Sequence, residues 1–310
     1  MTATPSNASA PAERVWLDTD PGMGVEGSDI DDGLAILLLL ASPELSLEGI
    51  SLTFGNVSLP DAAASCERVL TAAGCSTPFH LGAEGAGALH RPSAGAQAMV
   101  DAVNASPGEV TVLAIGPLTN VATAMQIDPE LPRKLRRLVI MGGAVEFPPF
   151  ADEGEFNFHK DGRAAAEVMA APCDRAMITM DLCAQAVFTQ AHLEALTPGA
   201  SHAGAVSRLL RDTVPGWLAH WKDNWNMPGF FPWDPIAVAY LTHPALFDER
   251  PCRFTVEPQG DKQGRLNGFE VVAKGDVDTV SVPSKLDGDG FLDLLVDRVG
   301  RYAAAQSADR

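Results

Sequence analysis

Two groups of aspartates near the N-terminus carry the strongest chemical signal in the chain. Asp18 and Asp20 end the apolar run that begins at Val15, and a Pro-Gly turn follows them; eight residues later, Asp31 and Asp32 open a second apolar run. Carboxylates this close raise one another's pKa unless a cation neutralises them, and oxygen ligands alone favour Ca²⁺ or Mg²⁺ over zinc. The aspartates could instead cap a helix. Because both acidic groups occur together, we favour a metal site.

Three further segments place glycine or polar residues directly after an apolar run. They are Gly55-Asn56, Ile115-Gly116-Pro117 and Met141-Gly142-Gly143. If each apolar run is a strand of an open α/β sheet, ligands bind outside the carboxyl ends of those strands. Together with the first aspartate pair, four segments of the chain are therefore expected to face one crevice.

An alternation of strand-like and helix-like stretches positions these segments. Short apolar runs at 14–18, 47–54, 109–115, 135–142 and 175–181 alternate with Ala- and Leu-rich stretches at 31–42, 59–74, 116–126 and 161–171. This rhythm predicts an α/β fold with an open, mostly parallel, Rossmann-like sheet covered by helices on both faces. The C-terminal part is expected to hold a Trp-rich helical stretch, a helix at 234–241, strands at 253–258, 268–273 and 278–282, and a final helix from about Gly290.

We expect one catalytic domain over residues 14–310, because no linker or internal repeat divides the chain. Residues 1–13 are small and polar and include proline, which is typical of a disordered tail and not of a signal peptide. The segment from Asp287 to Gly290 has the spacing of a calcium-loop fragment, but it lacks the other EF-hand ligands. We interpret it as a turn before the last helix.

Composition excludes several classes of partner. The chain has 310 residues, 22 basic and 40 acidic, for a formal net charge of −18, which argues against binding to a nucleic-acid polymer or an anionic membrane surface. The longest apolar run, 34–41, is too short to span a bilayer. Five cysteines without a CxxC pair suit a reducing compartment better than a disulfide framework, so we expect a cytoplasmic protein.

The acidic opening resembles the DxDPGxDD signature of the nucleoside hydrolases, the inosine-uridine-preferring family of N-ribosyl hydrolases. The resemblance continues in order along the chain from Val15 to at least Leu241. The matching segments are TFGNVS at 53–58, the GPLTN turn at 116–120, MGGA at 141–144, Glu155-Phe156-Asn157 with Asp161, and Trp233-Asp234-Pro235. The resemblance implies the nucleoside hydrolase fold and Ca²⁺-dependent hydrolysis of the N-glycosidic bond of a ribonucleoside, which releases ribose and the free base.

The resemblance also implies a role for each matching residue. The ion would be held by Asp20, Asp32, Asp234 and the backbone carbonyl of Ile115, and Asp20 would serve as the general base. The sugar hydroxyls would be bound by Asp31, Asn56, Glu155 and Asn157. These residue types suit the reaction, because breaking the bond builds positive charge on the sugar ring, which nearby carboxylates stabilise.

The chain departs from the family pattern where the leaving base is expected. Many relatives have histidine before the late Asp-Pro, whereas this chain has Trp233, as in the purine-preferring branch, in which an indole stacks on the base. Trp233 could instead be a core aromatic; we favour stacking and hence a purine preference. Trp217, Trp221 and Trp225 recur on one helix face. Such a stripe is usually core or a subunit contact, but we expect Trp221 and Trp225 to contribute to the base pocket.

A second departure is an insertion. Eight residues, Met23 to Ile30, stand where the signature has one, so Glu26 or Asp29 could compete as acids, or the loop could act as a lid. The segment between Gly82 and Met99 is compressed relative to the family. Contacts to the base and to the 5′ hydroxyl therefore remain open.

Two other functions compete with the leading hypothesis. A phosphohydrolase of the haloacid-dehalogenase type also begins with a strand and DxD, although the Pro-Gly after Asp20 and the second acidic pair argue against it. A non-catalytic ribose- or nucleoside-binding protein would keep the metal cluster without turnover. For the leading hypothesis, the expected partner is a small ribonucleoside, and we expect a homodimer or homotetramer.

Overall fold

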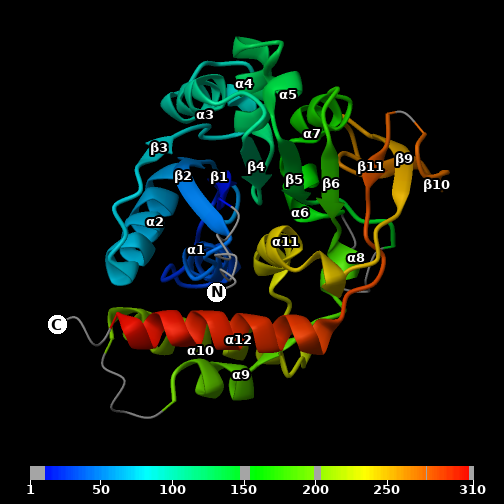
Figure 1. Ribbon diagram of the computed structural model, residues 1–310. Helices are drawn as coiled ribbons and strands as arrows, with labels where there is room; N and C mark the ends of the chain where they lie inside the picture. The colour runs from blue at the N-terminus through cyan, green and yellow to red at the C-terminus, as the bar shows by residue number, and fades with distance from the viewer. Residues whose placement is uncertain (1–10, 147–153, 199–203, 277, 307–310) are drawn as a thin grey trace, which may run out of the picture.

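A nine-stranded sheet forms the centre of the computed structural model, which describes residues 11–146, 154–198, 204–276 and 278–306 (Figure 1). The strand order is β10-β9-β11-β6-β5-β4-β1-β2-β3, and β7 and β8 form a separate small sheet. The strands are β1 (Glu13–Thr19), β2 (Leu45–Leu52), β3 (Phe79–Leu81), β4 (Val110–Ala114), β5 (Arg137–Met141), β6 (Arg175–Ile178), β7 (Phe188–Thr189), β8 (Gly229–Phe230), β9 (Pro251–Val256), β10 (Leu266–Val271) and β11 (Val280–Ser281). In the nine-stranded sheet, all pairs from β3 across to β11 are parallel, and β9 pairs antiparallel with both β11 and β10.

Helices cover both faces of this sheet. They are α1 (Asp31–Leu40), α2 (Leu59–Ala73), α3 (Ala94–Ala105), α4 (Thr119–Ile127), α5 (Leu131–Lys134), α6 (Phe156–Lys160), α7 (Gly162–Met169), α8 (Met180–Cys183), α9 (Gln190–Leu196), α10 (Ala205–Trp225), α11 (Trp233–Thr242) and α12 (Gly288–Ala305). One hydrophobic core joins the sheet to α1, α2, α9, α10, α11 and α12, and a second core on the other face joins it to α3, α4, α5 and α7. The predicted fold class, a mostly parallel α/β sheet covered on both faces, is confirmed.

Both acidic pairs lie in the interior because the strand and the helix that carry them are buried. Strand β1 is paired on both sides, with β2 and β4, and its last five residues are buried. Helix α1 is apolar on all its faces, as expected of a helix enclosed by other elements, and it packs against α11, which is buried from Asp234 to Leu241. The aspartates that open these two helices are therefore carried into the core with them.

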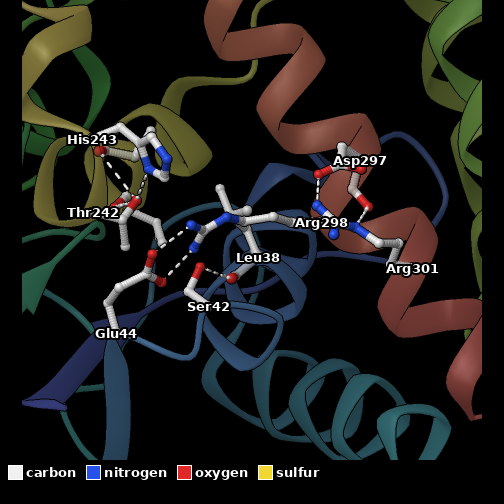
Figure 2. A network of polar contacts seen from close by, with 10 residues as sticks. Leu38, Ser42, Glu44, Thr242, His243, Asp297, Arg298 and Arg301 are labelled. Atoms are coloured by element: carbon white, nitrogen blue, oxygen red, sulfur yellow. Dashed lines mark hydrogen bonds and ion pairs between the residues drawn. The ribbon is translucent and has the colours of Figure 1, made fainter. Parts of the chain in front are cut away.

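The last helix is fastened across the α1 side of the sheet. Arg298 of α12 donates two hydrogen bonds of 2.6 Å to the carboxylate of Glu44, just before β2 (Figure 2). Beside this ion pair, the Ser42 hydroxyl donates to the carbonyl of Leu38 at the end of α1, at 2.7 Å. The C-terminal helix is thus joined to the connection between α1 and β2, at the end of α1 away from Asp31.

Several predicted boundaries differ from the structure. Strand β1 begins at Glu13, which we assigned to the tail, because its backbone amide donates to the carbonyl of Glu44 at 2.8 Å and it pairs with Leu45 of β2; residues 1–10 lie outside the described residues. Helix α12 begins at Gly288 and not near Gly290, since Asp287 caps it by accepting a hydrogen bond from the Gly290 amide at 3.0 Å. The segment that we interpreted as a turn before the last helix is therefore the cap and the first turn of that helix. Among the described residues, no helix has the length and apolar character needed to cross a membrane.

Candidate active site

A cavity of about 480 Å³ opens at the carboxyl ends of the parallel strands. Residues that follow β1, β2, β4 and β5 form its floor, and α10 and α11 supply one wall. Nine of the predicted site residues line it: Asp31, Asn56, Ile115, Glu155, Asn157, Trp221, Trp225, Trp233 and Asp234. Asp20 and Asp32 are fully buried, and both are hydrogen-bonded to Asn56 at the cavity floor. The structure therefore brings all the predicted site residues to one place.

Three carboxylates meet where α1 and α11 begin. One oxygen each from Asp31, Asp32 and Asp234 lies within 4.8 Å of the others, and all three residues are buried. The backbone amide of Asp234 donates to Asp31 at 3.1 Å, which ties the two helix ends together. Helix N-termini carry partial positive charge, which favours carboxylates in the first turn. That charge is small beside three anions in a buried site.

Asp20 supplies a fourth carboxylate, and one of its two oxygens lacks a hydrogen-bond partner. Its Oδ2 accepts a hydrogen bond of 2.6 Å from the backbone amide of Asn56, whereas its buried Oδ1 has no hydrogen-bond partner. Two glycines make room for this side chain: a Cβ at Gly55 would lie 2.0 Å from Oδ2, and a Cβ at Gly116 would lie 2.6 Å from Oδ1. The glycines after β2 and β4 thus shape the socket for the Asp20 carboxylate.

Asp32 is held by donors from three directions. Its Oδ1 accepts from the Thr19 hydroxyl at 2.5 Å and from the Asp20 amide at 3.1 Å, and its Oδ2 accepts from the Asn56 side chain at 2.9 Å. These bonds fix the carboxylate without neutralising it. Asn56, predicted to bind the sugar, therefore also positions Asp20 and Asp32.

The Glu155 segment closes the other end of the floor. The Glu155 carboxylate caps α6, accepting hydrogen bonds from the amides of Gly143, Asn157 and Phe158 at 2.8 to 2.9 Å. The Asn157 side-chain amide donates to the carbonyl of Ile115 at 3.0 Å, so its own carbonyl oxygen is the atom available to a ligand. The Ile115 carbonyl has a second lone pair for a further contact.

The electrostatics of the floor favour a bound cation. Burial is the largest cause, and repulsion from neighbouring aspartates the next, of raised pKa values here. The pKa values of Asp20, Asp31 and Asp234 lie well above the usual value for aspartate, and the pKa of Asp32 is raised to about 7. Burial also raises the pKa of Glu155. A bound divalent cation reverses these shifts, because it stabilises the ionised carboxylates.

The donor set fits a hard divalent ion. Four buried carboxylates and the Ile115 carbonyl offer oxygen alone, the ligand type of Ca²⁺ and Mg²⁺. The unpartnered Oδ1 of Asp20 supports the fit, because a buried carboxylate oxygen without a donor is otherwise costly. Asp18, which we grouped with this cluster in the sequence, accepts hydrogen bonds from Ser51 and Asn120 and does not line the cavity. Its role is to fasten neighbouring strand ends.

An aromatic wall faces the acidic floor. Trp217, Trp221, Trp225 and Trp233 all line the cavity. The rings are continuous: Trp221 lies 4.7 Å from Trp225 and 5.2 Å from Phe231, and Phe231 lies 4.9 Å from Trp233 between ring centroids. Trp221 is buried, whereas Trp225 is 43% exposed. The stripe on α10 is thus both core and cavity wall.

Sequence reasoning did not settle the contribution of the inserted loop. Gly27, Ser28 and Asp29 line the cavity, whereas Glu26 is exposed and does not. His220 and Asp223 line a neighbouring cavity. The acidic residues of the loop, next to Asp31, indicated that it could contribute to the site. The sequence did not indicate which inserted residue lines the cavity.

Comparison with known proteins identifies the family. The family model of the inosine-uridine preferring nucleoside hydrolases matches residues 15–293. The pyrimidine-specific ribonucleoside hydrolase RihA of Citrobacter koseri is 31% identical over 319 residues, covering 94% of this chain and 99% of its own. The chain belongs to the nucleoside hydrolases. The non-specific ribonucleoside hydrolase RihC of Escherichia fergusonii is 30% identical, covering 89% of this chain and 95% of its own.

Solved structures of nucleoside hydrolases share the fold. A purine-preferring ribonucleoside hydrolase from Gardnerella vaginalis superposes with a TM-score of 0.83 at 23% identity, covering 94% of this chain and 100% of its own. A plant nucleoside hydrolase gives 0.82 at 23% identity, covering 93% and 99%. This nucleoside hydrolase is therefore an enzyme that hydrolyses the N-glycosyl bond of ribonucleosides. That result decides against the phosphohydrolase and the non-catalytic binding protein.

Proposed function

We propose that this enzyme is a Ca²⁺-dependent nucleoside hydrolase that prefers purine ribonucleosides. The observation that supports it best is the placement of a buried carboxylate cluster, with one unpartnered oxygen on Asp20, opposite a wall of tryptophans in one cavity. The cluster suits a sugar diol and a cation, and the wall suits a flat base. A ribonucleoside carries the diol and the base.

The sugar is proposed to lie on the floor. Asp31 and Asn56 come from the β1 and β2 sides, and Glu155 and Asn157 come from the opposite side, so the ring is contacted from both. Carboxylates that accept hydrogen bonds from the hydroxyls hold the ribose and stabilise the positive charge that develops on its ring. Several carboxylates around one sugar therefore serve both binding and catalysis.

The ion is proposed to be held by Asp20, Asp32, Asp234 and the Ile115 carbonyl. Bound Ca²⁺ would keep these carboxylates ionised. It would also bind the two hydroxyls of the ribose diol and lower the pKa of the attacking water. Asp20 is proposed as the general base, because its Oδ1 is free of protein donors while its Oδ2 is fixed by Asn56. General base catalysis contributes roughly 10²–10⁴-fold to the rate.

The purine preference rests on Trp233 and its neighbours. Trp233 is half-buried at the start of α11, and it lines the same cavity as Asp234. Trp221 and Trp225 extend the aromatic surface beyond it. We propose that Trp233 stacks on the leaving base, and that a purine, with its two fused rings, uses this surface more fully than a pyrimidine does.

Ribose release from a panel of nucleosides tests the proposal. Inosine, guanosine, adenosine and uridine would each be incubated with the Ca²⁺-loaded enzyme, and the reducing sugar measured over time. We expect a higher kcat/KM for the purine ribosides than for uridine. A preference for uridine would contradict the purine assignment and would match the specificity in the name of the Citrobacter koseri relative.

Two further parts of the proposal concern the state of the protein in the cell. We propose a cytoplasmic enzyme, supported by five cysteines that are all free thiols. We also propose a homodimer or homotetramer. Light scattering coupled to gel filtration measures the second directly, and a monomer at micromolar concentration would contradict it.

A further inference from the structure

The inserted loop between Gly22 and Asp31 adds a carboxylate to the cavity floor. Asp29 is half-buried and lines the same cavity as Asp31 and Asn56. Its carboxylate lies within hydrogen-bond reach of the Asp31 carboxylate, which is proposed above to bind the sugar. Asp29 is therefore a neighbour of the proposed sugar site, yet it is not among the residues proposed to hold the ion or the sugar.

Backbone amides fix the orientation of the Asp29 carboxylate. Its Oδ1 accepts hydrogen bonds from the amides of Ile30 at 2.7 Å and Asp31 at 3.3 Å. The start of the loop is anchored as well, because the carbonyl of Met23 accepts a hydrogen bond of 2.7 Å from Arg68 on α2. In the described part of the chain, no amide or hydroxyl donor reaches the other carboxylate oxygen of Asp29, Oδ2. Oδ2 is thus the oxygen left for a ligand.

The Asp31 carboxylate beside it is fixed in the same way. Its Oδ1 accepts a hydrogen bond from the Asp32 amide and its Oδ2 accepts one from the Asp234 amide, each at 3.1 Å. Adjacent ionised carboxylates repel each other unless a cation or hydrogen-bond donors compensate. A carboxylate has about four lone-pair sites, so Asp29 and Asp31 can each accept a further hydrogen bond from a ligand. Two acceptors therefore stand side by side on the floor.

The diol of ribose matches a pair of adjacent acceptors. Its two hydroxyls lie on neighbouring carbons and on the same side of the ring, and each has one hydrogen to donate. An ion that binds the diol contacts the lone pairs of the two oxygens, so both hydrogens remain to be accepted by the protein. Two neighbouring carboxylates can accept these hydrogens, one each.

We propose that Asp29 is a substrate-binding residue: its carboxylate accepts a hydrogen bond from one hydroxyl of the ribose diol, and Asp31 accepts one from the other. This inference rests on the proposed function and deepens it, because it assigns the diol to a pair of carboxylates, one of which belongs to the insertion. A site built around a substrate hydroxyl discriminates against analogues that lack it, because its own polar group is then left unpaired.

The Asp29→Asn variant removes the proposed acceptor. The amides of Ile30 and Asp31 require an acceptor, so they will hold the asparagine through its carbonyl oxygen, and its NH₂ group will take the place of Oδ2. The substitution thus replaces an acceptor with a donor and keeps the size of the side chain. Glu26→Gln is the matched control, because it removes one negative charge from the same loop at an exposed position that does not line this cavity.

The assay measures how tightly 2′-deoxyinosine, 3′-deoxyinosine and 5′-deoxyinosine bind, as inhibitors of inosine hydrolysis at saturating Ca²⁺. Asp29→Asn should weaken the binding of 5′-deoxyinosine, whose diol is complete, by about 10- to 100-fold, the usual effect of losing a hydrogen bond to a charged group. One of the other two analogues lacks the hydroxyl that Asp29 accepts, and its binding should change less than about twofold. The remaining analogue should be weakened as much as 5′-deoxyinosine. Glu26→Gln should leave all three unchanged.

The Asp31→Asn variant separates direct binding from an effect through Asp31. Its binding of the same analogues identifies the hydroxyl that Asp31 accepts. We expect the two variants to be insensitive to the loss of different hydroxyls of the diol. If both were insensitive to the loss of the same hydroxyl, Asp29 would act by positioning Asp31, and the inference would be overturned.

The remaining outcomes distinguish the inference from the proposed function. An equal loss for all three analogues in Asp29→Asn would overturn the inference and assign Asp29 to loop structure, and no loss for any of them would overturn it too. Calorimetry should still find one Ca²⁺ ion bound per chain in this variant; loss of the ion would make Asp29 a metal ligand instead. Full activity of the wild type without Ca²⁺, or a preference for uridine, would contradict the proposed function. The comparison of hydroxyls would still decide the role of Asp29, because it depends on the sugar alone.

Discussion

Adding one methyl group at Gly116 should disable the site without unfolding the protein. A Cβ at this position would lie 2.6 Å from Oδ1 of Asp20 and 2.9 Å from Cγ2 of Thr53. Ordinary contacts begin near 3.4 Å, so the Asp20 carboxylate must retreat. The required shift is roughly 0.8 Å, and a misplacement of about 1 Å in a catalytic group costs on the order of 10²-fold in rate.

The Gly116→Ala variant should therefore lose about 10²-fold in kcat, and it should need more Ca²⁺ for half-maximal activity. Overpacking of this kind also destabilises the fold by about 1–3 kcal/mol. The measurements are ribose release across a Ca²⁺ titration, and thermal unfolding with and without the ion. Because Asp20 is displaced, the stabilisation by Ca²⁺ should be smaller in the variant than in the wild type.

Gly216→Ala provides the matched control. Gly216 lies within α10, and a Cβ there would meet nothing within 4 Å. Alanine in a helix is favoured over glycine by about 1 kcal/mol, so this variant should be slightly more stable and fully active. If Gly116→Ala kept wild-type kcat and Ca²⁺ dependence, Asp20 would not act at the position assigned to it.

Three further predictions concern other parts of the molecule. Trp233→Ala should lower kcat/KM for inosine by about 10- to 100-fold, since stacking on a base contributes about 1–3 kcal/mol, whereas Trp233→Phe should lose much less; equal losses would indicate simple packing. Asp20→Asn should lower kcat by at least about 10²-fold while the protein stays folded by circular dichroism, and a variant of near-normal rate would exclude Asp20 as the base. The hydrogen bonds from Arg298 lower the pKa of Glu44, so this pair stabilises the fold above the unfolded-state pKa of about 4.3, and the effect disappears as the pH falls through the lower folded-state pKa. Because Glu44 is 46% exposed, Glu44→Gln should cost less than about 1 kcal/mol at pH 7 and nothing near pH 3; an equal cost at both pH values would contradict the ion pair.

The sheet and the placement of the floor were predictable because they depend on local patterns. Apolar runs of strand length alternate with helical stretches, and the rule that ligands bind at the carboxyl ends of strands places Asp20, Asn56 and Ile115 together. The three-carboxylate cluster lies in the first turns of two buried helices: Asp31 and Asp32 open α1, and Asp234 is the second residue of α11.

Other features depend on contacts between distant residues, which one sequence does not display. Helix α6, five residues long, begins where the Glu155 carboxylate accepts hydrogen bonds from backbone amides, one of them from Gly143 on another loop. Likewise, the inserted loop points Asp29 inward because α2 anchors Met23 from behind. The tryptophan stripe was ambiguous for a different reason: an amphipathic pattern does not distinguish a core from a cavity wall, and Trp221 belongs to both.

The most direct test of the account is the Ca²⁺ dependence of ribose release. The enzyme would be stripped with a chelator, dialysed and assayed with inosine, before and after measured additions of Ca²⁺, with bound ion counted by calorimetry. We predict no turnover in the stripped enzyme, and recovery that saturates as one ion binds per chain and that is lost in an Asp32→Asn variant. Full activity in the metal-free enzyme would contradict the assignment of the carboxylate cluster as a catalytic metal site.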